Sequence, residues 1–225
     1  MVEKYSEKNE AIGILMLNTE FPRLKGDIGN RDTFSFPTIS YVVQEACSSN
    51  VVVEPNKELV RFFIEGAQAL EQQGVKAITT SCGFLSIYQQ EIARSVHVPV
   101  ATSALLLLPV ISQMIGGEKI GILTASETTL QKEYFVACGA ENVSREIKGM
   151  EGTEFYKMYV QGNCDADINI METEIYNRAS EFSEAGAILL ECTNMPPFSA
   201  KLYNLGIPVF DIRTLVCFLY YGIMS

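Results

Sequence analysis

The stretch KAITTSC, residues 76–82, is a short apolar run that ends in a cysteine, and AILLEC, residues 187–192, repeats this layout. Two more pairs keep a similar offset along the chain: IGILML from Ile12 matches IGILTA from Ile120, and HVPVAT matches GIPVFD. Three correspondences in register indicate an internal duplication. The sequence therefore predicts two related lobes, each with a cysteine at the same topological position.

Short apolar runs rich in β-branched residues predict strands whose two faces are both covered. Between them lie helical patterns such as NKELVRFFIEGAQALEQQG, which opens near Asn56 and stops at Gly74. The alternation predicts an α/β fold with two pseudo-symmetric lobes, each a parallel sheet flanked by helices, and a cleft between them. The predicted strands begin at Ala11, Lys76, Val98, Lys119, Ala187 and Ile207.

A helical pattern follows each proline-containing strand, SALLLLPVISQMIGG after the first and RTLVCFLYYGI after the second. In a pseudo-symmetric arrangement each of these helices can cross to the opposite lobe, with hinges near Ser103 and Phe210. The predicted N-terminal lobe comprises residues 1–103 and 211–225, and the predicted C-terminal lobe comprises residues 104–210.

Composition narrows the classes of partner. The 225 residues carry a formal charge of −10, which disfavours nucleic acid and anionic membranes and favours a small-molecule partner. The charged residues 1–10 do not resemble a secretory signal, and the longest apolar runs are too short to span a bilayer, so we expect a cytoplasmic protein. The apolar stretch LVCFLYYGIM makes a homodimer a reasonable expectation.

Missing motifs exclude several chemistries. His97 is the one histidine, expected to be structural or exposed, so the chain lacks the residues for a histidine-rich metal centre or a Ser-His-Asp site. It has no G-x-S-x-G, P-loop or G-x-G-x-x-G motif. We therefore expect no cofactor and no metal.

Two of the six cysteines stand apart from the others. Cys82 and Cys192 each follow a predicted strand just before a helix, where open α/β sheets present ligand-binding groups, whereas the other four look like small buried hydrophobes. A helix start beside each thiol is expected to lower its pKa. Two thiols facing each other suit inversion at a carbon acid, because one removes a proton from one face while the other returns a proton to the opposite face.

At these residues the chain resembles the aspartate/glutamate racemase superfamily of cofactor-independent enzymes, through SCGF around Cys82, ECTN around Cys192 and the duplicated layout. The resemblance implies that both cysteines form the acid and base of a racemase or epimerase. Its substrate would be a small carboxylate, such as aspartate, glutamate or a derivative, inverted at Cα. The alternatives are a hydantoin racemase, decarboxylase or cis-trans isomerase of the same superfamily, or a two-lobed metabolite-binding protein without chemistry.

The resemblance also implies substrate-binding residues. Thr193 matches the threonine that follows the second cysteine and would bind the substrate carboxylate or amino group. Gly83 and Phe84 stand where the amino-acid enzymes have an Asn-Thr pair. The other implied binding residues are Asn194 after Thr193, Asn18 and Thr19 after the first strand, and Thr124 and Ser126 in TASETTL.

Two further features leave alternatives open. Ser126 either contributes to a carboxylate cradle or caps the next helix, or does both. The long segment Thr19–Thr38 is expected to cover the cleft, and either Arg23 or Arg31 could clamp a carboxylate or simply be solvated. Glu191 precedes the second cysteine, and strand alternation predicts that its side chain points away from the thiol.

Overall fold

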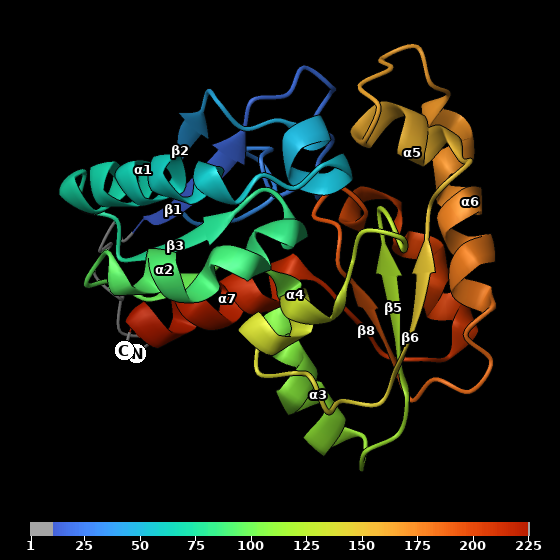
Figure 1. Cartoon of the computed structure of the whole chain (residues 1–225). Coiled ribbons are helices and arrows are strands. Elements are labelled where there is room, and N and C mark those ends of the chain that lie inside the picture. Colours follow the sequence, from blue (N-terminus) through green and yellow to red (C-terminus); the bar gives the residue numbers. More distant parts are fainter. Residues whose placement is uncertain (1–10, 225) are drawn as a thin grey trace, which may run out of the picture.

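The computed structural model describes residues 11–224, which form two lobes built on four-stranded parallel sheets (Figure 1). In the first lobe the strand order is β2-β1-β3-β4. In the second lobe it is β6-β5-β7-β8, the same order carried by the second half of the chain. The strands are β1 (Ile12–Leu17), β2 (Thr38–Val43), β3 (Ala77–Thr80), β4 (Val100–Ala101), β5 (Ile120–Thr124), β6 (Arg145–Gly149), β7 (Ala187–Leu190) and β8 (Val209–Phe210).

The registers of the two sheets also correspond. Ile12 of β1 pairs with Ala77 of β3, and Ile120 of β5 pairs with Ala187 of β7. All residues of β1 and β5 are buried, as expected for central strands covered on both faces. Gly121 in β5 is required by this packing, because a Cβ there would meet the ring of Phe182 at 2.6 Å. The two-lobed α/β fold predicted from the duplication is confirmed.

The predicted helix from Asn56 to Gly74 is confirmed. Asn56 caps its first turn by accepting the N–H of Glu58 at 3.0 Å, and Gly74 follows its end at φ +88°. The helices are α1 (Val60–Gln72), α2 (Gln89–Arg94), α3 (Leu108–Met114), α4 (Lys132–Ala137), α5 (Glu154–Tyr159), α6 (Ile168–Ser180) and α7 (Ile212–Ile223). Shorter turns are η1 (Ser49–Val53), η2 (Lys57–Leu59), η3 (Gly83–Tyr88), η4 (Ala104–Leu107), η5 (Pro196–Phe198) and η6 (Ala200–Leu205).

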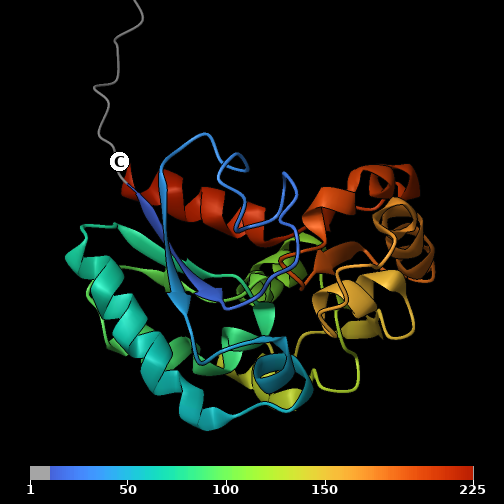
Figure 2. The same cartoon turned by 90° about the horizontal axis from the view of Figure 1, so that it is seen from above.

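Two connections tie the lobes together. After β4 the chain enters η4, which packs against β7 of the second lobe. After β8 it enters α7, which runs back across the first lobe, packs against β3 and lies on the face opposite α1 (Figure 2). The predicted crossing is therefore confirmed for α7 and for the η4 turn that opens the other helical segment, whereas the lobe boundaries near Ser103 and Phe210 stay a prediction.

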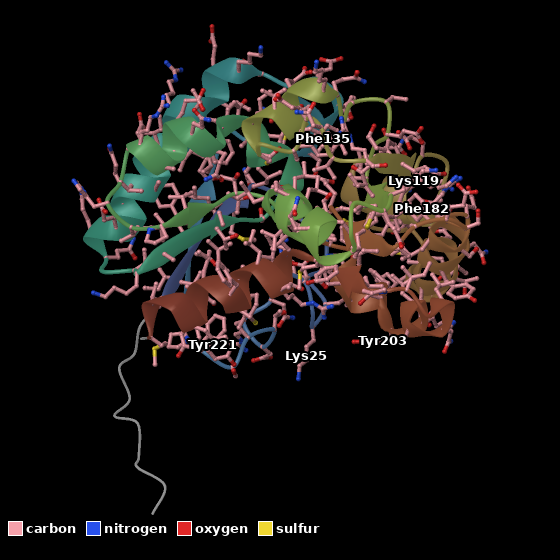
Figure 3. The ribbon with its side chains drawn as sticks, turned by 90° about the horizontal axis from the view of Figure 1, so that it is seen from below. Lys25, Lys119, Phe135, Phe182, Tyr203 and Tyr221 are labelled. Carbon is pink, nitrogen blue, oxygen red and sulfur yellow. The ribbon has the colours of Figure 1, made fainter. Side chains whose placement is uncertain are left out.

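Two tyrosines, the histidine and one of the two candidate arginines lie on the outer surface. Tyr203 and Tyr221 point outward, at 84% and 73% exposure (Figure 3), and the homodimer expected from the α7 sequence stays a prediction. His97 is exposed beside Glu71, as expected, and Arg31 is also exposed.

Within residues 11–224, no helix combines the length and the apolarity that crossing a membrane requires. The charged residues 1–10 lie outside the described part of the chain.

Candidate active site

Equivalent strand ends position the two cysteines. β3 ends at Thr80 and β7 ends at Leu190, so each thiol lies two residues beyond its strand, at the carboxyl edge of its sheet. Cys82 and Cys192 both line one cavity between the lobes and are only 9% and 8% exposed. The predicted pair of thiols therefore shares a single cavity.

Threonine hydroxyls hold the backbone around both thiols. The Thr80 hydroxyl donates to the backbone oxygen of Thr102 at 2.6 Å and lies 3.0 Å from that of Cys82, which fixes the turn after β3. The Thr193 hydroxyl crosses between the lobes and donates to the backbone oxygen of Ser81 at 2.6 Å. Because these bonds are buried, they hold the two cysteine turns in a fixed relation.

The cavity is small and largely enclosed. Its free space is about 20 Å³, counted as positions open to the centre of a water molecule, which suits about one water. The first lobe contributes Phe21 and the turn at Ser48, and the second contributes Tyr159. The Ser48 hydroxyl donates to the backbone oxygen of Tyr159 at 2.9 Å and closes the seam between the lobes. A substrate larger than water therefore needs this seam to open.

Burial dominates the ionisation of both thiols. It raises the pKa of Cys82 to about 12, the negative charge of Glu191 adds to the rise, and the N–H groups of Phe84 and Leu85 and the charge of Arg23 oppose it. The pKa of Cys192 is raised well above its usual value, again by burial first and then by Glu191. The expected net lowering of the pKa by a helix start is wrong, because desolvation outweighs the backbone N–H groups.

The two thiols are not equivalent. Cys82 is stabilised as a thiolate by two backbone N–H groups and by Arg23, whereas Cys192 has the single N–H of Asn194 and an added opposing charge at Asp27. The thiolate therefore forms more easily at Cys82.

Glu191 is buried in the site. Its side chain lines the cavity and is 0% exposed, so the expectation that it points away from the thiols is wrong. β7 ends at Leu190, and the alternation of strand side chains does not extend beyond it. The Thr124 hydroxyl donates to Glu191 Oε2 at 2.9 Å, and Oε1 has no hydrogen-bond partner among the described residues.

Asp27 is a site-organising residue that the sequence analysis missed. It is 1% exposed and accepts hydrogen bonds from Arg23 Nη1 at 2.9 Å, from the Gly29 N–H at 2.7 Å and from the amide of Asn194. The bond to Asn194 ties the Thr19–Thr38 segment of the first lobe to the second cysteine turn. The sequence signal for Asp27 was the GDIGN turn, but Asn194, its hydrogen-bond partner, is 167 positions away along the chain.

Most of the predicted binding residues also line the cavity. Thr19, Gly83, Phe84, Thr193 and Asn194 belong to its lining, with the Thr19 hydroxyl accepting a hydrogen bond from Arg23 Nη2 at 3.0 Å. The Cys192 thiol donates to Asn194 Oδ1 at 3.6 Å. Contact of these residues with a substrate stays a prediction.

The other three predicted binding residues lie outside the cavity lining. Asn18 is exposed at a neighbouring hollow and donates to the backbone oxygen of Gln44. Thr124 lies behind Glu191, and Ser126 donates to Glu151 Oε1 at 2.9 Å. The predicted helix cap at Ser126 is wrong, because a turn follows it and α4 begins only at Lys132.

Aromatic rings form one side of the cavity. Phe21 and Tyr159 meet edge to face at 4.8 Å between ring centroids, and the Arg23 guanidinium lies 4.8 Å from the Phe21 centroid. Arg23 is the one Lys, Arg or His in the described lining. Within residues 11–224, no three His, Cys, Asp or Glu side chains gather as a metal site would require.

Comparison with solved structures places the fold in a known class. The chain is similar to an aspartate racemase homologue from Pyrococcus horikoshii, with a TM-score of 0.63 and 16% identity, over 96% of this chain and 100% of that one. It is also similar to the aspartate racemase of Picrophilus torridus, with a TM-score of 0.58, 20% identity and coverage of 89% and 87%. A mutant arylmalonate decarboxylase with sulfate matches with a TM-score of 0.58, 15% identity and coverage of 88% and 86%. The chain therefore has the two-lobed α/β fold of these solved structures, which the resemblance implied.

Comparison of sequences finds curated relatives that are dimethylsulfoniopropionate lyases. The chain is 29% identical over 220 residues to the dimethylsulfoniopropionate lyase of Durusdinium sp. clade D, covering 91% of this chain and 72% of that protein. It is 30% identical over 223 residues to dimethylsulfoniopropionate lyase 3 of Emiliania huxleyi, covering 91% of this chain and 57% of that protein. The chain thus spans little more than half the length of some of these relatives. No protein-family model matches it.

Proposed function

We propose that the chain is a cofactor-independent lyase that cleaves dimethylsulfoniopropionate, or a closely related β-sulfonio carboxylate. The observation that carries the proposal is that two thiols line one closed cavity, in a chain whose curated relatives are lyases of this substrate. The same thiols that would invert a carbon acid can begin an elimination, because both reactions start with removal of a Cα proton. The amino-acid substrate expected from the resemblance is the second candidate.

The reaction balances without a cofactor. A thiolate takes the proton at Cα, so that the Cα–H bond breaks and an S–H bond forms. The electron pair makes the Cα–Cβ double bond, and the Cβ–S bond breaks with its electrons going to sulfur. The products are acrylate and neutral dimethyl sulfide, and one proton is finally released to solvent. Because the leaving group is neutral, no acid is needed to protonate it.

Cys82 is the proposed base. Two backbone N–H groups and Arg23 favour its thiolate, whereas Asp27 opposes that of Cys192. An elimination needs one base, so Cys192 is left to pack against the substrate. This assignment separates the lyase from a racemase, in which both thiols must exchange protons.

Arg23 is the proposed partner of the substrate carboxylate. It is the cation of the described lining, and its contacts with Asp27 and Thr19 fix the guanidinium while leaving further N–H donors. A positive charge beside the carboxylate also stabilises the carbanion-like state that forms when Cα loses its proton. The rings of Phe21 and Tyr159 suit the sulfonium group, because aromatic faces attract cations.

Racemisation remains a second candidate because both cysteines occupy equivalent positions in the two lobes and line the same cavity. An inverting enzyme needs this symmetry, and an elimination does not.

The test is to supply the purified protein separately with dimethylsulfoniopropionate and with enantiopure aspartate and glutamate. Gas chromatography measures dimethyl sulfide, liquid chromatography measures acrylate, and polarimetry follows the amino acids. We expect dimethyl sulfide and acrylate in equal amounts, with no loss of optical rotation. Cys164→Ser is the matched control for substitution of either cavity cysteine, because Cys164 is exposed and lies outside the cavity. Loss of rotation without dimethyl sulfide would establish the racemase instead. Thermal stabilisation by these ligands without any product would indicate a binding protein.

A further inference from the structure

Glu191 has a carboxyl oxygen that the fold isolates beside both thiols. The residue is 0% exposed, its Oε2 accepts a hydrogen bond from the Thr124 hydroxyl at 2.9 Å, and its Oε1 has no partner among the described residues. A fully buried carboxylate oxygen without a hydrogen bond is costly. The unpaired Oε1 therefore does not stabilise the fold, and its place beside the thiols indicates a role in the chemistry of the site.

A glycine next to Cys82 makes room for this oxygen. A Cβ on Gly83 would overlap Glu191 Oε1 and would lie 2.5 Å from the backbone oxygen of Glu191. Because Gly83 directly follows Cys82 and Glu191 directly precedes Cys192, the carboxyl lies between the two cysteine turns. Its charge acts on both thiols, as the second-largest cause of the raised pKa in each.

A thiolate in a closed cavity needs somewhere for its proton to go. With Glu191 ionised, a thiolate would put two negative charges side by side in a space that admits about one water. With the proton moved to Glu191, the cavity still carries one negative charge. The exchange breaks the S–H bond and forms an O–H bond, so no outside acid or base is consumed.

We propose that Glu191 takes the thiol proton when the thiolate forms, so that Glu191 and Cys82 share one negative charge inside the cavity. Glu191 acts through the thiol and does not need to touch the substrate. The inference rests on the proposed function only for what the thiolate does to a substrate. The sharing of the charge itself does not depend on any substrate. After an elimination, the proton on Glu191 leaves for solvent and restores the resting site.

The other titratable groups around Glu191 do not compete for this role. Tyr134 on α4 and Cys138 just after its end have raised pKa values, mainly through burial, with the charge of Glu191 as a further cause, so both stay neutral. Arg23 faces the site from the loop, and its guanidinium is paired with the Asp27 carboxylate. Burial raises the pKa of Glu191 itself to about 7, which suits a carboxyl that must both lose and regain a proton near neutrality.

The charge sharing gives the thiol an unusual pH dependence. Below about pH 7, Glu191 is already protonated, so forming the thiolate sends a proton to solvent and the thiolate population rises tenfold per pH unit. Above that value the proton passes from Cys82 to Glu191 with no net release, so the population levels off until the pH is high enough for both groups to be ionised together. An ordinary buried thiol shows one rise and no early plateau.

The experiment measures the rate at which iodoacetamide alkylates Cys82, by peptide mass spectrometry, between about pH 6 and pH 10. In the parent protein we expect the rate to rise and then level off near pH 7. In Glu191→Gln we expect no plateau and a continued tenfold rise per pH unit. Glu151→Gln is the matched control, because Glu151 also accepts a hydroxyl hydrogen bond at this sheet edge but lies outside the cavity lining.

A second measurement does not require reagent to reach the thiol. Infrared difference spectra report protonated carboxyl groups, and we expect a band that titrates near pH 7 in the parent and in Glu151→Gln but is missing from Glu191→Gln. A parent profile without a plateau, or the same plateau and band in Glu191→Gln, would overturn the inference. Neither readout uses dimethyl sulfide, so the inference can survive a failure of the proposed substrate, and the reverse also holds.

Discussion

Substitution of Gly83 by alanine tests whether the carboxyl and the first cysteine turn are packed as described. The added Cβ would overlap Glu191 Oε1 and would lie 2.5 Å from the Glu191 backbone oxygen. A side chain can rotate away, but the backbone oxygen belongs to the turn that follows β7 and cannot move alone. The two cysteine turns must therefore separate, which shifts Cys82 relative to Cys192.

We expect Gly83→Ala to lower the free energy of unfolding by about 1–3 kcal/mol, which is the cost of overpacking a well-packed interior. For a chain of this size, that loss lowers the melting temperature by roughly 2–12 °C. We also expect a loss of activity larger than the stability change explains, because the reacting groups are displaced.

The assays are urea unfolding and release of dimethyl sulfide by Gly83→Ala. Gly222→Ala is the matched control, because an added Cβ at that position of α7 meets nothing within 4 Å. The reasoning is refuted if Gly83→Ala is as stable and as active as the control.

Asp27→Asn removes the charge that holds Arg23 and should lower the free energy of unfolding by about 3 kcal/mol, as for other buried ion pairs, in urea titrations; an unchanged midpoint would contradict the pairing. Arg23→Lys keeps the charge but loses the forked geometry, so KM for dimethylsulfoniopropionate should rise about tenfold or more while kcat changes less; an unchanged KM would show that the carboxylate binds elsewhere. Glu191 has a pKa of about 7 in the folded protein, above its value of about 4.3 in the unfolded chain. Its proton is therefore held more tightly by the folded state, and its contribution to stability is full at low pH and is lost as pH rises through the folded pKa. Between about pH 4.5 and pH 7.5 the parent should lose about 3 kcal/mol of stability that Glu191→Gln does not lose; equal pH profiles in urea titrations would contradict this.

The central strands could be predicted from sequence because burial on both faces leaves a continuous apolar run. The edge strands β2 and β6 were missed for the opposite reason. β2 is partly exposed along most of its length, and β6, REIKG, is partly exposed and carries three charged residues. Their pairing with β1 and β5 is set by the sheet and not by an apolar pattern.

The cysteine pair could be predicted because duplication repeats a position, and parallel strands deliver their carboxyl ends to one edge. The surroundings could not be predicted in the same way. Asp27 reaches Asn194 across 167 positions, and Tyr159 enters the site from α5. Glu191 was misassigned because strand alternation was applied beyond the end of the strand. The pKa direction of the thiols was missed because depth of burial is a property of the assembled lobes.

Release of dimethyl sulfide from dimethylsulfoniopropionate by the parent, Cys82→Ser and Cys192→Ser, measured side by side by gas chromatography, tests the account most directly. We expect Cys82→Ser to lose about 10²–10⁴-fold in rate, as for removal of a general base, and Cys192→Ser to lose much less. Full activity in Cys82→Ser, or no dimethyl sulfide from the parent, would contradict it.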